Sequence, residues 1–155
     1  MAGIGKTSIV KHVAILCQER NAFDGIIYLS LEEKHYANDL IAMLYHNLKL
    51  GLSTNELKEL NNMTIKQEEY LGRRESKKYK NIKEEDESKE FAKQIELNKQ
   101  DLEKIIFCLQ KKEAILLILD GVQDFLARDK ADFKYTLHQI LSRCTQVKII
   151  TTSKR

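Results

Sequence analysis

The segment Gly3-Ile4-Gly5-Lys6-Thr7-Ser8 decides the fold, because it opens an amphipathic helix close to the start of the 155-residue chain. Phosphate-binding loops have the pattern glycine, four residues, glycine, lysine, and then serine or threonine. Gly5, Lys6 and Thr7 match three of these four positions, and the fourth falls one place before Met1. The glycines let successive backbone N–H groups point at phosphate oxygens, and the following helix adds its positive N-terminal end. We therefore predict a phosphate-binding loop.

Each residue type in this loop predicts a separate role. The Lys6 ammonium group is expected to reach the β- and γ-phosphates, and the Thr7 hydroxyl is expected to be a ligand of Mg²⁺. Gly3, Ile4, Gly5 and Ser8 complete the predicted nucleotide-contacting residues. This pattern predicts a nucleoside di- or triphosphate together with Mg²⁺.

A second signal is the apolar run 114–119, which ends in Asp120. A carboxylate at the end of a buried strand is the usual partner of a phosphate loop, because it holds the Mg²⁺ shell from the neighbouring strand. We expect Asp120 to be a metal-binding and catalytic residue. Asp124 follows four residues later, and two interpretations stay open. It activates or positions the attacking water, or it is a surface acid at the start of a helix.

A third signal is the β-prone run 147–152, which leads into Ser153 and Lys154. Lys154 at the end of such a strand is a candidate catalytic residue, because a cation there would stabilise the γ-phosphate. The alternative is a solvated chain end.

The rest of the chain alternates between helical and strand patterns. Apolar residues recur at three- and four-residue spacing in the predicted helices, and the predicted strands are apolar throughout. This alternation predicts an α/β fold with a parallel sheet flanked by helices in three layers. The strand that should lead into the loop is missing from the sequence. The predicted helices are 8–19, 37–49, 102–109 and 133–141, and the predicted strands are 25–31, 114–119 and 147–152.

Residues 54–99 differ from the rest, so we predict one partial domain over 1–155 that contains this stretch as a charged helical or mobile insertion. From Thr64 to Lys99 basic and acidic residues nearly balance, and large apolar side chains are few. Mixed charges of this kind are typical of a solvated helix or a mobile segment rather than a binding surface.

Composition excludes several classes of protein. Lys and Arg number 26 against 23 Asp and Glu, and a net charge of +3 is too small to indicate a nucleic-acid partner. The longest apolar run is far shorter than the ~20 residues of a membrane helix. Cys17, Cys108 and Cys144 lack the spacing of a disulfide scaffold or a zinc site and are expected to pack as small hydrophobes. These features favour a reducing, cytoplasmic setting.

Four segments together resemble the STAND-type NTPases, the NB-ARC and NACHT group. Residues 1–14 resemble the phosphate loop and first helix of that group, and 23–31 its second strand. Residues 116–124 resemble the Walker B region, although Gly121 stands where a second acid is usual in NB-ARC domains. Residues 147–154 resemble the sensor strand, with Lys154 where an arginine is usual. The resemblance covers about 1–50 and 100–155.

This resemblance implies a three-layer P-loop NTPase fold and a signalling switch that binds ADP or ATP with Mg²⁺. It implies slow or absent hydrolysis, because Gly121 leaves the hydrolytic base undefined. The implied partners are nucleotide, other domains of a longer protein, and further copies of the chain on activation. Two other hypotheses stay open: a P-loop ATPase or kinase of another branch, and a non-binding remnant or protein-interaction fragment of such a domain.

Overall fold

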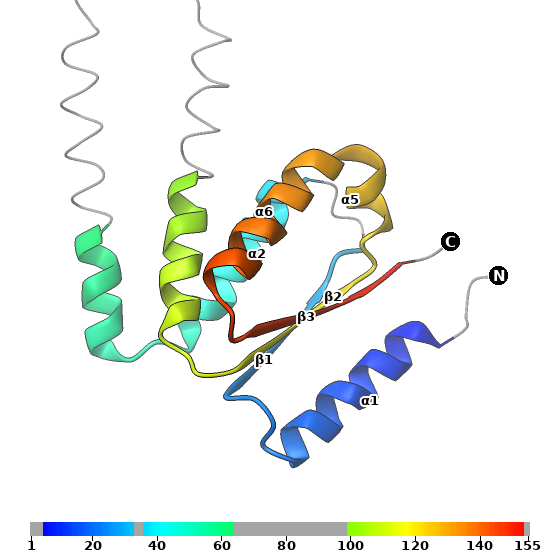
Figure 1. The fold of residues 1–155 in the computed structure, drawn as a ribbon, viewed down its shortest axis with the longest axis horizontal. Coiled ribbons are helices and arrows are strands. Elements are labelled where there is room, and N and C mark those ends of the chain that lie inside the picture. Colours follow the sequence, from blue (N-terminus) through cyan, green and yellow to red (C-terminus); the bar gives the residue numbers. More distant parts are fainter. Residues whose placement is uncertain (1–4, 33–35, 64–98, 154–155) are drawn as a thin grey trace, which may run out of the picture.

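The computed structural model describes residues 5–32, 36–63 and 99–153, which form an α/β fold in three layers (Figure 1). A parallel sheet lies in the middle, with α1 on one face and the remaining helices on the other. The elements are α1 (Lys6–Glu19), β1 (Gly25–Ser30), α2 (Ala37–Leu50), β2 (Ile115–Asp120), α5 (Gln123–Arg128), α6 (Lys130–Arg143) and β3 (Val147–Thr152). Residues 54–63 and 99–110 are also helical. The predicted α/β class and parallel sheet are confirmed.

The three strands lie in the order β1-β2-β3, with both neighbouring pairs parallel. All six residues of β2 are buried, because this strand has a partner on each side and helices over both faces. Full burial explains why its sequence is an unbroken apolar run rather than an alternating one. The register places Ser30, Asp120 and Thr152 in line, so all three strands end at one edge of the sheet. We call this edge the carboxyl edge.

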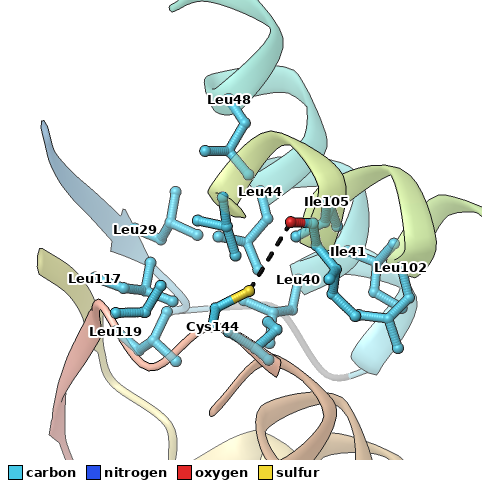
Figure 2. Packing of buried hydrophobic residues seen from close by; sticks show 14 of the residues in the cluster. Leu29, Leu40, Ile41, Leu44, Leu48, Leu102, Ile105, Leu117, Leu119 and Cys144 are labelled. Carbon is cyan, nitrogen blue, oxygen red and sulfur yellow. Dashed lines mark hydrogen bonds between the residues drawn. The ribbon is translucent and has the colours of Figure 1, made fainter. Parts of the chain in front are cut away.

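The main hydrophobic core lies between the sheet and the helices on the face opposite α1. Figure 2 shows leucines of α2 packing against leucines of β1 and β2, with Cys144 among them. The Cys144 thiol is buried and lies 3.9 Å from the Ile106 carbonyl oxygen, to which it donates. Cys108 is buried in the same core. Burial raises the pKa of both thiols, so they remain protonated and pack as the sequence predicts.

A smaller core lies under α1, on the opposite face of the sheet. Val10 is the buried residue of α1 and packs with Leu116 and Ile118 of β2, while Ala14 and Cys17 lie at the margin. Ile9 and Leu16 belong to the apolar periodicity of this helix, yet they are not buried, with exposed fractions of 59% and 48%. The reason is geometric, because a helix lying on a flat sheet buries only the narrow stripe through Val10, Ala14 and Cys17.

The predicted insertion is described only at its ends. Residues 54–63 are helical, and Leu60 among them is fully buried in the main core. Residues 64–98 lie outside the described residues. Within the described ranges, no helix is long and apolar enough to span a membrane.

Candidate functional site at the carboxyl edge of the sheet

The start of α1 has the geometry expected where a phosphate loop enters its helix. Gly5 is the N-cap residue and has a φ of 73°, a left-handed conformation that favours glycine. The helix begins at Lys6, and the Ile9 N–H donates to the Gly5 carbonyl at 2.8 Å. Glycine offers no side chain to the free N–H groups of the first turn, and that turn contains no acidic residue. This helix end therefore carries positive potential suited to an anion.

Asp120 is the centre of a hydrogen-bonded group at the carboxyl edge. It lies at the end of β2 and its exposed fraction is only 5%. The Tyr28 hydroxyl donates to Asp120 Oδ2 at 2.6 Å, and the Thr152 hydroxyl donates to Oδ1. The hydroxyl of Thr7, at the start of α1, lies close enough to help lower the pKa of this carboxyl group. Hydroxyl groups from β1, β3 and α1 thus surround one buried carboxylate.

These donors keep Asp120 ionised in spite of its burial. Burial raises the pKa of this carboxyl group, but the hydrogen bonds from Thr152, Tyr28 and Thr7 and the charge of Lys11 together lower it by more. The pKa of Asp120 therefore lies below its ordinary value. A permanent negative charge is what a cation-binding carboxylate requires.

Tyr28 is held on two sides. Its hydroxyl bonds Asp120, and the Lys11 ammonium group of α1 lies 5.6 Å from its ring centroid, within cation–π range. Burial, the hydrogen bond to Asp120 and the negative charges of Asp120 and Glu32 raise the pKa of Tyr28 to about 12. The phenol therefore remains a proton donor throughout the physiological range.

Gly121 makes the turn that follows Asp120. Its φ is +87°, and a Cβ built there would lie 3.3 Å from the Glu32 Cγ. Its N–H lies 3.1 Å from the Thr152 carbonyl oxygen and 3.0 Å from the Thr152 hydroxyl, and the Val122 N–H donates to the same carbonyl at 2.8 Å. An acidic residue at 121 would be strained and crowded.

The structure brings together some of the sequence-predicted site residues. Thr7 lies near enough to Asp120 to affect its pKa, and Gly5, Lys6 and Ser8 lie at the adjoining helix start. Asp124 is half-buried in the first turn of α5, and its carboxylate makes no hydrogen bond or ion pair with the described residues. Its two interpretations stay open. Gly3, Ile4 and Lys154 lie outside the described residues.

Neither Tyr28 nor Thr152 is a site residue that the sequence predicts. Tyr28 reads as an aromatic residue at the margin of the core, and Thr152 as the last residue of a β-prone run. Their place near the ends of parallel strands is the one signal that could have found them, because the ends of such strands meet at one edge.

The possible metal ligands at this edge suit Mg²⁺, which takes part of its coordination from phosphates and waters. They suit less well a metal ion whose ligands all come from the protein. Asp120 supplies a carboxylate there and Thr7 a hydroxyl, and Mg²⁺ in nucleotide sites typically takes one or two carboxylates plus phosphates and waters. Over the described ranges, no group of three or more His, Cys, Asp or Glu side chains is arranged to hold a metal ion.

Comparison with protein-family models, with curated proteins and with solved structures found no significant match to this chain.

Replacing Asp120 with asparagine is expected to destabilise the fold in a pH-dependent way. Asparagine keeps the size but removes the charge, and the loss is expected to be about 1–3 kcal/mol near neutral pH, the cost of disrupting buried hydrogen bonds. Because the pKa of Asp120 is lowered on folding, its contribution is present above the unfolded value of 3.8 and is lost as pH falls through the lower folded value. Urea unfolding near neutral and near acid pH measures this. A difference between wild type and variant that does not shrink in acid would contradict it.

Proposed function

We propose that the chain is a nucleotide-binding module that holds ADP or ATP together with Mg²⁺ at the carboxyl edge of its sheet. The observation that carries this proposal is the place of Thr7 beside Asp120, where the Thr7 hydroxyl helps to lower the pKa of the Asp120 carboxyl group. The two sequence motifs assign this hydroxyl and this carboxylate to the metal. These residues lie far apart in the sequence. They meet beside the start of a helix whose N-cap is a glycine with positive φ.

Positively charged groups would contact the phosphates, and Thr7 and Asp120 would contact the cation. Lys6 and the N–H groups of the first turn of α1 would neutralise the phosphate oxygens. The Thr7 hydroxyl can donate its proton to Asp120 while its lone pairs face a cation, so Asp120 orients Thr7 as well as supplying negative charge. Thr7 and Asp120 would hold Mg²⁺, which when bound would supply positive charge to offset that of the phosphates.

Within this function, we favour a switch over a fast hydrolase. Gly121 has no side chain, and the strained φ at this position disfavours an acid there. Asp124 is the remaining candidate base from the sequence, and it does not join the Asp120 group. A module of this kind would bind ATP or ADP and turn over slowly, as the resemblance to STAND NTPases implies. Its proposed setting is cytoplasmic, and its proposed partners are adjoining domains and further copies of the chain.

Calorimetric titration of the chain with ATP and with ADP, each with and without Mg²⁺, tests the proposal. We expect both nucleotides to bind and Mg²⁺ to strengthen ATP binding, because a cation offsets the repulsion between phosphates and Asp120. Inorganic tripolyphosphate is expected to compete and adenosine is not, since the described contacts point to phosphate recognition. A folded chain that binds neither nucleotide would contradict the proposal and favour a non-binding fragment. Rapid steady hydrolysis would favour a P-loop ATPase of another branch.

A further inference from the structure

Tyr28 is an unexplained part of the carboxyl edge. It is not in the phosphate loop or at the end of β2, yet its hydroxyl makes a 2.6 Å hydrogen bond to Asp120. In the parallel register Tyr28 lies beside Ile118, two residues before Asp120 on the same face of the sheet. The phenol therefore reaches diagonally along the sheet, a span that suits a long aromatic side chain.

The hydrogen bonds to Asp120 fix the plane of its carboxylate. An aspartate side chain turns readily about its last torsion angle, so a single hydrogen bond leaves its orientation loosely defined. Here Oδ2 accepts from Tyr28 and Oδ1 accepts from Thr152, which come from the strands on either side of β2. Opposed donors on the two oxygens define one orientation.

We propose that Tyr28 is a positioning residue for the cation that accompanies the nucleotide. It acts through Asp120, by holding the carboxylate in the plane that also presents it to Thr7. This inference rests on the proposed nucleotide function and adds a determinant of cation binding to it. Mg²⁺ demands near-ideal octahedral geometry, so a small error in the direction of the carboxylate lowers cation affinity.

Lys11 supports the same arrangement from the other side of Tyr28. Its ammonium group lies 5.6 Å from the ring centroid, and its charge also lowers the pKa of Asp120. Both Lys11 and Thr7 belong to α1. Tyr28 therefore connects β1 to the helix that begins at the predicted phosphate loop and to the strand that carries the predicted metal-binding residue.

The test is Tyr28→Phe, which removes the hydroxyl and keeps the ring. The packing of the ring under α1 and its contact with Lys11 remain available, so we expect the variant to fold. The quantity to measure is the ratio of ATP affinity in saturating Mg²⁺ to ATP affinity in excess EDTA. We expect this ratio to fall by about tenfold or more, the usual effect of removing a group that orients a metal ligand. ATP affinity in EDTA is expected to stay unchanged.

Tyr45→Phe is a matched control. Tyr45 lies on α2, is half-buried, and also carries a lysine over its ring, with Lys104 Nζ at 5.7 Å from the centroid. The same chemical change there is expected to leave the ratio as in wild type. A purely structural role for Tyr28 would weaken ATP binding equally with and without Mg²⁺.

Three results would overturn the inference. An unchanged ratio in a folded Tyr28→Phe variant would show that the hydroxyl does not orient Asp120 for the cation. A higher ratio would show that Tyr28 competes with the cation for Asp120. A wild-type chain that binds ATP with no dependence on Mg²⁺ would remove the cation role while leaving nucleotide binding intact, whereas a wild type that does not bind ATP would reject the proposed function itself.

Discussion

Replacing Lys6 with alanine is expected to lower ATP affinity by about 100-fold or more. A hydrogen bond to a charged group contributes about 1.5–3 kcal/mol, and each 1.4 kcal/mol is tenfold in affinity, so losing one ammonium with two phosphate contacts reaches this range. Lys6 is the first residue of α1, and alanine is the best helix former, so the helix itself is expected to remain. Calorimetric titration with ATP in Mg²⁺ measures the loss.

The control for this variant is Lys49→Ala. Lys49 is exposed in the last turn of α2. The Gly51 carbonyl oxygen, two residues later, accepts a hydrogen bond from the Lys112 side chain, and Lys112 lies just before β2. That position lies toward the amino ends of the strands, away from the carboxyl edge. The same loss of one positive charge there is expected to leave ATP affinity unchanged within twofold, because exposed charges at this range are largely screened. Equal losses in the two variants would mean that net charge, and not the loop, governs binding. An unchanged affinity in Lys6→Ala would remove Lys6 from the phosphate site.

The strands could be predicted from sequence because burial leaves a strong local signal. The run that ends at Asp120 is apolar at every position, and the structure gives β2 as Ile115–Asp120 with all six residues buried. The predicted run 147–152 coincides with β3. The helix after Gly5 was also predictable, because the phosphate-loop motif and the apolar periodicity both indicate that a helix begins there.

Other features depend on tertiary structure and leave little local trace. The helix α5 has six residues, too few for a periodic pattern, and the sequence offers it only through one of the two interpretations of Asp124. The sequence places Tyr28 in a strand, whose side chains point alternately to the two faces of the sheet. It does not show which of these faces α1 covers. The partnership of Tyr28 and Thr152 with Asp120 depends on the order β1-β2-β3, which places both neighbours of β2 beside its last residue. Strand order is a long-range property that periodicity does not encode.

The largest stability effect is expected at Phe125, in the segment that follows Asp120. Phe125 is fully buried, and its ring lies against Phe133 of α6 with centroids 5.2 Å apart. A helix as short as α5 has no stability of its own, so this side chain anchors it. Phe125→Ala is expected to cost about 3–5 kcal/mol through lost burial and the cavity left behind. Urea unfolding of the nucleotide-free chain measures the loss.

Leu126→Ala is the control, because it is the next residue of the same helix but has an exposed fraction of 40%. It is expected to change the free energy of unfolding by about 0.5 kcal/mol or less. Should Phe125→Ala fail to fold, Phe125→Leu is the substitute, because leucine fills most of the volume. Its free energy of unfolding is expected to lie between those of the Phe125→Ala and Leu126→Ala variants.

The Gly121 and Val122 N–H groups donate to the Thr152 carbonyl oxygen, and this turn lies a few residues before Phe125 in the sequence. Loosening α5 is therefore also expected to weaken Mg²⁺-dependent ATP binding, through the position of Asp120. Equal stability of the Phe125 and Leu126 variants would show that α5 is not anchored by its buried ring.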